Sequence, residues 1–163
     1  MEIKTKIKSQ TSENLNVIYR DIDSTEELKG KKPQQVHAYC FYQGKLVIVY
    51  TPSKAIWTPP GGGIEPGETV EQAVIREVLE ETNMKVLKQH LIGFQEIHEP
   101  ERVLIQTRSV CLVEPNGPFV SDPDGDITEI KLIEPSDYKK YFDWGDIGDH
   151  LMERALELKK NFN

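Results

Sequence analysis

Three glutamates, Glu77, Glu80 and Glu81, stand three and four residues apart in a segment with helical apolar periodicity. At this spacing their carboxylates gather on one face of a helix and repel one another. Carboxylates in the last turn also oppose the helix dipole, at about 0.3–1 kcal/mol each. A helix built only for stability would carry lysine there, so the pattern favours a site for divalent cations. A solvated acidic face on an acidic protein is the structural alternative.

A glycine- and proline-rich loop, Pro59–Glu68, runs directly into this helix. Three successive glycines, Gly61–Gly63, give the backbone angles that other residues cannot adopt. A carbonyl such as that of Gly62 can therefore turn toward a cation. Mg²⁺ takes oxygen ligands in an octahedron and keeps several waters. A glycine carbonyl beside two or three carboxylates meets that requirement.

The helix itself is predicted over Val70–Thr82, with Thr69 as its N-cap and Gln72 completing a capping box. Asn83 follows, and asparagine tolerates the left-handed conformation that ends many helices. Its apolar residues are expected to form a stripe that packs on a sheet: Val74, Ile75, Val78 and Leu79.

Arg76 lies away from this apolar stripe. We expect it to form an ion pair with a nearby carboxylate such as Glu68, which would hold the loop onto the helix. Binding of a substrate phosphate is the alternative role.

These residues resemble the Nudix box. Gly62 is followed after five residues by Glu68, and Glu68 after seven by Arg76-Glu77-Val78-Leu79-Glu80-Glu81-Thr82. Asn83 stands where the family has glycine, and Met84 fills the last aliphatic position. Asparagine can adopt the same left-handed geometry, so this departure leaves the chemistry untouched. We expect the resemblance to extend from about Val36 to the C-terminus.

The resemblance implies an α/β/α sandwich with a mixed β-sheet, within the α/β (α+β) class. It implies that Glu77, Glu80 and Glu81, joined by the carbonyl of Gly62, bind Mg²⁺ or Mn²⁺. The substrate would be a nucleoside diphosphate linked to another group. Water would attack one phosphorus, and the other phosphate would leave.

The carboxylate that takes the proton from this water is left open among three residues. Within the helix Glu77 or Glu80 could serve as the base. Outside it Glu129 is preferred, because it follows the acidic turn Asp122–Asp126 at a place where many relatives carry an accessory acid. An exposed glutamate at a strand end is the structural alternative for Glu129.

The elements that must position this site are strands around a central helix. Strand-like stretches are predicted at Asn16–Arg20, Gln35–Tyr42, Lys45–Thr51, Leu91–Glu99, Val103–Glu114 and Ile127–Glu134. Gln43-Gly44 reads as a hairpin turn, and further helices are expected at Ile147–Lys160 and near Ser136–Tyr141. Residues 1–163 are expected to form one domain. Residues 1–30 either add strands to the sheet or form an arm that docks on a second subunit.

Composition excludes several classes of protein. The net charge is −7 and no basic stripe appears, so a nucleic-acid partner is not expected; cations between carboxylates and phosphates would reconcile this charge with a phosphate-bearing ligand. No apolar run approaches the roughly 20 residues of a membrane span, and no secretory signal is evident. Cys40 and Cys111 lie in apolar segments and are expected to be reduced core residues of a cytoplasmic protein. A homodimer is common in the family and is left open.

Competing motifs fail on specific positions. No lysine follows the glycines as a P-loop requires, and Pro66 stands where a dinucleotide fingerprint needs its third glycine. The turn at Asp122–Asp126 resembles an EF-hand opening, but Ile127 and Ile133 replace its glycine and its bidentate glutamate. The four histidines, expected to be isolated surface or strand residues, lack the spacing of zinc ligands: His37, His90, His98 and His150.

Two other functions on the same fold are weighed against hydrolysis. A non-catalytic nucleotide sensor usually lacks the metal-binding glutamates, which are present here. Isoprenoid diphosphate isomerisation needs a reactive cysteine, and Cys40 lies in an apolar strand. Selectivity is expected from residues outside the helix: the segment Tyr39–Tyr42, Phe94, Arg102, Arg108 and the loop Tyr141–Asp149 with Trp144. ADP-ribose-like compounds, nucleoside triphosphates, dinucleoside polyphosphates and nucleotide sugars remain open as substrates.

Overall fold

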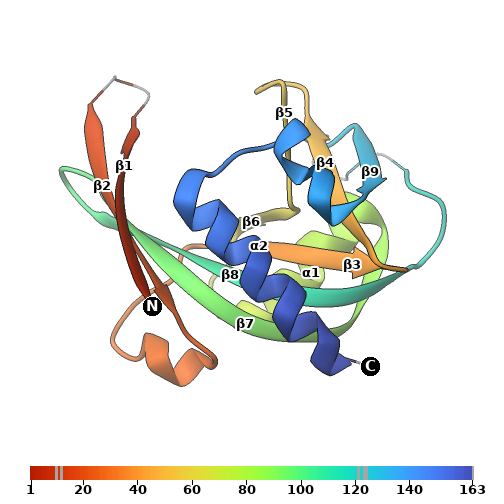
Figure 1. The fold of residues 1–163 in the computed structure, drawn as a ribbon, viewed down its shortest axis with the longest axis horizontal. Helices are drawn as coiled ribbons and strands as arrows, with labels where there is room; N and C mark the ends of the chain where they lie inside the picture. Colours follow the sequence, from red (N-terminus) through yellow and green to blue (C-terminus); the bar gives the residue numbers. More distant parts are fainter. Residues whose placement is uncertain (10, 12, 121, 123–124, 163) are drawn as a thin grey trace.

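Strands dominate the computed structural model, which describes residues 1–9, 11, 13–120, 122 and 125–162. The strands of the described residues are β1 (Glu2–Lys8), β2 (Asn14–Asp21), β3 (Gln35–Tyr42), β4 (Lys45–Thr51), β5 (Ile56–Thr58), β6 (Gly61–Gly63), β7 (Met84–His98), β8 (Val103–Pro115) and β9 (Glu129–Ile133). They form one mixed sheet in the order β1-β2-β7-β8-β3-β4-β5, while β6 pairs with β3 and β9 with β4. Residues 1–30 thus supply β1 and β2 at one edge of the sheet (Figure 1).

The pairing of β3 with β8 is parallel, and it places distant polar residues side by side. Gln35 lies opposite Gln106, and His37 lies opposite Arg108. On the other side of β8, Gln106 lies opposite Gln95 of the antiparallel neighbour β7. Three strands therefore carry a continuous polar row across the sheet, ending near the start of β3.

Two helices cover opposite faces of this sheet, α1 (Val70–Thr82) behind it and α2 (Gly145–Lys159) in front of it in Figure 1. Short 3₁₀ turns lie at Thr25–Leu28 (η1), Pro135–Lys140 (η2) and Lys160–Phe162 (η3). The arrangement is the expected α/β/α sandwich. None of the helices in the described part of the chain has the length and apolar character of a membrane span.

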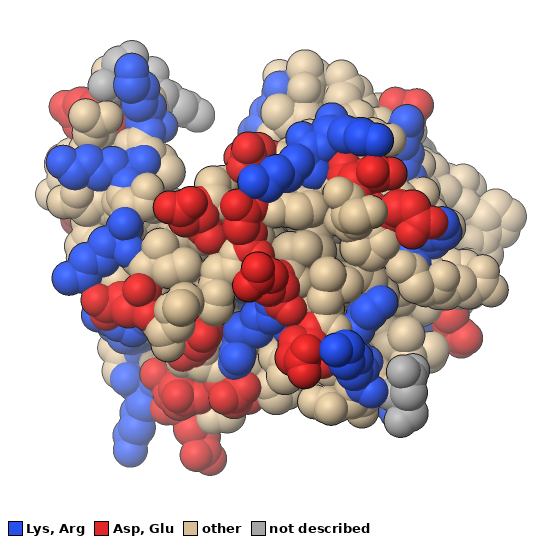
Figure 2. Space-filling model, in the orientation of Figure 1, with Lys and Arg blue, Asp and Glu red and all other residues tan. Residues whose placement is uncertain are grey.

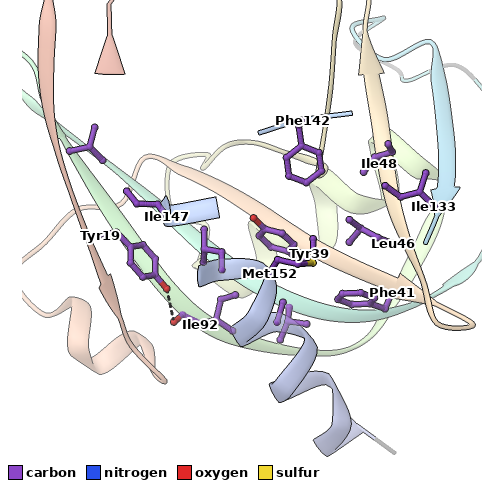
Figure 3. Packing of buried hydrophobic residues seen from close by; sticks show 14 of the residues in the cluster. Tyr19, Tyr39, Phe41, Leu46, Ile48, Ile92, Ile133, Phe142, Ile147 and Met152 are labelled. Atoms are coloured by element: carbon purple, nitrogen blue, oxygen red, sulfur yellow. Dashed lines mark hydrogen bonds between the residues drawn. The ribbon is translucent and has the colours of Figure 1, made fainter. Parts of the chain in front are cut away.

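Alternation along β3 divides the interior into two cores. Tyr39 and Phe41 point to the α2 side, where they pack with Tyr19, Ile92, Met152 and Phe142 (Figure 3). Val36, Ala38 and Cys40 point to the α1 side and pack on Val74 and Val78. The sheet is therefore held between two apolar layers, and the first residues of β3 face the loop that precedes α1.

Cys40 and Cys111 are free, buried thiols, as expected. They lie opposite each other in the β3–β8 pairing, inside the α1-side core. Burial raises the pKa of the Cys40 thiol well above its usual value, and its neighbour Cys111 adds to the effect. A protonated, enclosed thiol is a poor nucleophile.

Some predicted boundaries were wrong. β7 begins at Met84, directly after α1, and not at Leu91; irregular pairing at Val86/Lys88 and Leu91/Gly93 breaks the alternation that would have marked its first half. β9 begins at Glu129 rather than Ile127, and α2 begins at Gly145 rather than Ile147. In the acidic turn the Gly125 amide donates to the carbonyl of Asp122 at 2.8 Å, while residues 123 and 124 of that prediction lie outside the described residues.

The expected apolar stripe of α1 was also wrong in part. Ile75 and Leu79 are 46% and 41% exposed, whereas Ala73 and Thr82 are buried with Val74 and Val78. The buried arc is rotated by about a quarter turn toward Glu81, which is itself only 8% exposed. The helix therefore turns part of its acidic face inward and leaves two aliphatic side chains in solvent.

Candidate active site

The glycine loop lies against the C-terminal half of α1 at distances that admit no side chain. A Cβ atom on Gly61 would lie 2.1 Å from the carbonyl oxygen of Val36, and one on Gly62 would lie 2.4 Å from Oε1 of Glu77. The Gly61 amide donates to Oε1 of Glu81 at 2.8 Å. Glycine at these positions thus brings backbone and helix carboxylates into direct contact.

Local signals set the ends of α1 and so fix where the glutamates stand. The Thr69 side chain accepts a hydrogen bond from the backbone amide of Gln72 at 3.1 Å, and Oε1 of Gln72 accepts one from the backbone amide of Thr69 at 2.9 Å. At the other end Asn83 adopts the left-handed conformation with φ 54°. The capping box and the left-handed end are both as expected.

Glu81 is a buried carboxylate in a crowd of like charge. Burial raises its pKa to about 8, the hydrogen bond from Gly61 opposes this, and the charges of Glu77, Asp122 and Asp126 add to it. Burial likewise raises the pKa of Glu77, and the Arg76 guanidinium opposes that rise. The folded protein alone therefore does not fully compensate the negative charge at this point.

Arg76 joins the loop to the helix. Its Nε and Nη2 atoms donate to the two oxygens of Glu68 at 2.7 and 2.8 Å, which is the pairing expected from the sequence. Nη2 also donates to the carbonyl of Gly63 at 2.8 Å, and Nη1 to Oε1 of Glu77 at 2.8 Å. The same Nη1 lies 3.4 Å from Oε2 of Glu80. Because of this pairing, the pKa of Glu68 falls to about 2.

A cleft of about 340 Å³ opens beside these groups. We call it the acidic cleft, and its polar lining includes Gln35, His37, Lys54, Gly61, Glu81 and Asp126. Two carboxylates and the Lys54 side chain thus line the same space. This combination suits a phosphate held between cations and a basic side chain.

The predicted metal ligands differ in how they meet the cleft. Glu81 and Gly62 line it, and Glu77 packs on Gly62. Glu80 is bound at its Oε2 by Arg76. Among the described residues, no three carboxylate, imidazole or thiolate groups stand close enough to hold an ion in the present arrangement. The chemistry of the donors nevertheless fits a hard cation, because they are oxygens and one of them is a buried, insufficiently compensated carboxylate.

The accessory acid was expected at Glu129, and the structure places that residue exposed at the start of β9, opposite Tyr50. Asp126, three residues earlier, lines the cleft, and Asp122 is 5% exposed and its charge helps to raise the pKa of Glu81. The sequence marks this segment as an acidic turn but does not by itself assign its aspartates to the site. Its composition was the signal that could have identified these two aspartates.

The residues expected to confer selectivity separate into two groups. Tyr39, Arg108 and Trp144 meet on the α2 side of the sheet, with Trp144 over the Arg108 guanidinium at 5.0 Å. Phe94 belongs to the α1-side core, and Arg102 pairs with Glu99 in the exposed β7–β8 loop. Only the first group lies near the cleft, through its contact with His37.

His37 had been expected to be an isolated residue, and the structure places it instead between the acidic cleft and Arg108. It lines the cleft, packs edge-on against Trp144 at 5.7 Å between ring centroids, and has its Nδ1 atom 3.4 Å from Nη1 of Arg108. Desolvation lowers the pKa of His37 to about 3, helped by the charges of Arg108 and Lys54. It is therefore a neutral imidazole at physiological pH. No signal in the local sequence marks this role, because the contact depends on the pairing of β3 with β8.

Comparison with known proteins adds independent information. The family model described as NUDIX domain matches residues 31–154. A protein of Bacillus subtilis named putative 8-oxo-dGTP diphosphatase is 38% identical over 63 residues, which is 32% of this chain and 42% of that protein. Phosphatase NudJ of Escherichia coli K12 is 32% identical over 98 residues, or 55% of this chain and 60% of that protein. The matches thus span less than two thirds of either relative.

Solved structures share the fold. The Bacillus subtilis pyrophosphohydrolase BsRppH superposes with a TM-score of 0.70 at 19% identity, covering 94% of this chain and 96% of that one. A MutT structure from work on Aliivibrio salmonicida and Vibrio cholerae superposes with a TM-score of 0.57 at 22% identity, covering 77% and 97% of the two chains. At these identities the likeness establishes the architecture alone.

Proposed function

Because this chain belongs to the NUDIX family, whose domain model matches residues 31–154, we propose that it is a metal-dependent pyrophosphohydrolase. It cuts a phosphoanhydride bond in a small nucleotide-like substrate, a nucleoside diphosphate linked to another moiety. The observation that carries this proposal is the burial of Glu81 beside Glu77, Asp122 and Asp126, against a loop that only glycine can form. A folded protein keeps so unfavourable a cluster of charge where function requires it.

The proposed ligands of Mg²⁺ or Mn²⁺ are Glu77, Glu80, Glu81 and the carbonyl of Gly62. When bound, the cation would neutralise phosphate charge and lower the pKa of a water molecule. The protein's own part is to hold these oxygens in place. Gly61 orients Glu81 through its amide, and Arg76 orients Glu77 while it ties the loop down through Glu68.

A carboxylate of the site takes the proton from the attacking water in this proposal. Glu77 and Glu80 are retained as candidates from the helix. Asp126 replaces Glu129 as the candidate from the acidic turn, because Asp126 lines the cleft and Glu129, on β9, does not. Lys54 lines the same cleft, and in this proposal its ammonium group contacts a phosphate oxygen of the substrate.

The test is hydrolysis of a substrate panel with Mg²⁺ or Mn²⁺, measured as release of phosphate-containing products. The panel comprises ADP-ribose, nucleoside triphosphates, dinucleoside polyphosphates and nucleotide sugars. We expect turnover of at least one class, its loss on chelation, and a fall of at least about 100-fold in Glu81→Gln. Glu71→Gln is the matched control, since Glu71 is exposed on the same helix and does not line the cleft.

Two outcomes would contradict the proposal. Binding of nucleotides without turnover of any substrate, with either metal, would identify a nucleotide sensor instead. Near wild-type turnover in Glu81→Gln would remove that carboxylate from the metal site. Isomerisation of an isoprenoid diphosphate is disfavoured, because Cys40 is enclosed in the α1-side core.

A further inference from the structure

A second cavity, of about 510 Å³, adjoins the acidic cleft at His37, which lines both. It lies between the β1–β2 hairpin and the start of α2, where a notch separates the hairpin from the rest of the surface (Figure 2). We call it the hairpin pocket. Its walls include Val17, Ile97 and Ile147, and besides His37 its polar lining comprises Thr5, Lys6, Gln95, Gln106, Arg108, Asp143 and Asp146.

Arg108 is the unusual member of this pocket. It is 4% exposed, yet no carboxylate of the described residues lies within ion-pair distance of its guanidinium. Its Nη atoms reach only neutral acceptors, with Nη2 at 3.2 Å from Oε1 of Gln106 and Nη1 at 3.1 Å from the carbonyl of Thr107. Its Nε atom is buried without a hydrogen-bond partner among the described residues. A buried cation without a counter-charge destabilises the folded protein unless another group supplies the missing partner.

A second unpartnered polar atom lies beside the same ring. The hydroxyl of Tyr39 is buried without a hydrogen bond to any described residue, and Tyr39 meets the edge of Trp144 at 6.2 Å between ring centroids. Trp144 therefore covers both the Arg108 guanidinium and the Tyr39 ring. It is only partly buried and precedes Gly145, whose φ is +67°. A turn of this ring would open both polar groups to the pocket.

The chemistry of the pocket favours a flat ring over a second phosphate. Asp143 and Asp146 offset the charges of Lys6 and Arg108 in the lining, so the pocket offers no net positive charge to an anion. The apolar walls and Trp144 offer surfaces on which an aromatic ring stacks. The guanidinium offers two parallel N–H groups on one edge, which match two neighbouring acceptor atoms.

We propose that the hairpin pocket holds the base of the nucleotide and that Arg108 selects a 6-oxopurine, such as guanine, through its O6 and N7 atoms. Arginine can donate to both of these acceptors at once through its two parallel N–H groups. Adenine presents an amino group in place of O6, so it would set a donor against the guanidinium. This inference rests on the proposed function, because the adjoining acidic cleft would then hold the phosphates.

The pocket also has a structural means of fixing Arg108. Gln95 donates to Gln106 at 2.7 Å, Gln106 donates to Gln35, and Arg108 donates to the same Gln106 oxygen. This row links the hairpin pocket to Gln35 in the wall of the acidic cleft. The guanidinium is thereby held in one orientation, as selective recognition requires.

The first experiment measures binding without metal or turnover. GMP, 7-deaza-GMP and AMP are titrated against the full chain, with Trp144 fluorescence as the readout and Trp144→Phe identifying its signal against that of Trp57. We expect GMP to bind more tightly than AMP by roughly 5- to 150-fold. The 7-deaza analogue, which lacks N7, should fall between them. Equal affinities for the three probes would overturn the inference.

The second experiment uses Arg108→Met, which keeps the volume and removes the charge. We expect it to lose the preference for GMP while its melting temperature is unchanged or raised, because an incompletely paired buried charge has been removed. A folded variant that keeps the preference, or a large loss of melting temperature, would assign Arg108 a structural role instead. Arg108→Lys is the second variant, and it should also lose discrimination between GMP and its 7-deaza analogue, since lysine lacks the fork.

The outcomes separate this inference from the proposed function. Selective GMP binding that depends on Arg108, in a chain that hydrolyses nothing, would support the pocket and refute the hydrolase. Turnover of guanine and adenine substrates with equal kcat/KM, unaffected by Arg108→Met, would support the hydrolase and refute the pocket.

Discussion

Replacing Glu81 by glutamine removes a carboxyl group whose ionisation the metal-free protein disfavours. The pKa of this carboxyl is raised from 4.5 to about 8, because of burial and the nearby charges of Glu77, Asp122 and Asp126. Between these two values the folded protein keeps a proton that the unfolded chain has released. Stability therefore falls as the pH rises through that interval and levels off above it. At neutral pH this cost is about 3 kcal/mol, taken as an upper value because the neighbouring carboxylates adjust as well.

Glutamine matches the neutral form of the side chain and can still accept the hydrogen bond from the Gly61 amide. We therefore expect Glu81→Gln to be more stable than the wild type by about 2–3 kcal/mol at pH 7 without metal, and by little at about pH 5. The assay is urea denaturation in a chelator across this pH range. Glu71→Gln should change the free energy of unfolding by less than about 0.5 kcal/mol at every pH.

Magnesium should reverse the order of stability. Its binding stabilises the wild-type protein by about 4.1 kcal/mol at a concentration of roughly 1,000 times Kd, while Glu81→Gln gains little. Two results would refute the reasoning. One is a stability profile of Glu81→Gln that declines with pH as the wild type does, and the other is an equal response of both proteins to magnesium.

Other consequences of the structure can be measured in the same way. Gly62→Ala places a Cβ 2.4 Å from Oε1 of Glu77 and should lower kcat/KM more than Gly63→Ala, whose Cβ meets nothing closer than 3.9 Å; equal effects would contradict the close approach. Thr69→Ala removes the acceptor for the Gln72 amide and should cost about 1 kcal/mol in denaturation, whereas an unchanged midpoint would show that the cap adds nothing. For Asp21, burial raises the pKa but hydrogen bonds from His150 and Tyr19 lower it more, so its contribution is present above its unfolded pKa and lost as the pH falls through the lower folded value. Asp21→Asn should therefore be less stable at neutral pH and show a flatter acid denaturation profile.

The sequence predicted those features whose causes are local. The ends of α1 follow from Thr69, Gln72 and Asn83, which act within one turn of the helix. The bounds of β3 and β4 follow from continuous apolar runs divided by Gln43-Gly44, where both residues take positive φ. The loop–helix contact through Arg76 and Glu68 is also short in sequence. In each case the interaction partners lie close enough in the chain for spacing alone to identify them.

The rotation of α1 could not be predicted in this way. Periodicity assigns the buried face to the most apolar arc, and that arc includes Ile75 and Leu79. The structure instead buries Glu81 and exposes both of these aliphatic side chains. The rule fails because the helix is oriented by the glycine loop it must contact, not by burial of apolar area alone. Local and global preferences disagree here, and such disagreement is expected at a functional site.

Contacts that depend on strand pairing could not be predicted from the sequence either. His37 meets Arg108 because β3 and β8 run parallel in one particular register, and nothing in either segment encodes that register. A shift of either strand by one residue would put the two side chains on opposite faces of the sheet. Arg108 and Trp144 could be suspected individually from their types, but the cavity between the β1–β2 hairpin and α2 arises only from the assembled sheet.

Glu81 and Arg108 flank His37 from two directions and share one physical property. Each is a buried ionisable group whose charge the described protein compensates incompletely. They cannot compensate each other, because the row of uncharged side chains including His37 and Gln35 lies between their two cavities. A ligand that brings cations and phosphates to the acidic cleft and an acceptor-bearing ring to the hairpin pocket would supply partners for both groups at once. Removing either ionisable group alone should therefore stabilise the ligand-free protein and weaken its binding of the ligand. In the double variant, the effects of the two substitutions on the free energy of unfolding should be additive, since the residues lie in separate cavities. Their effects on the free energy of binding should not be additive, because one molecule spans both cavities.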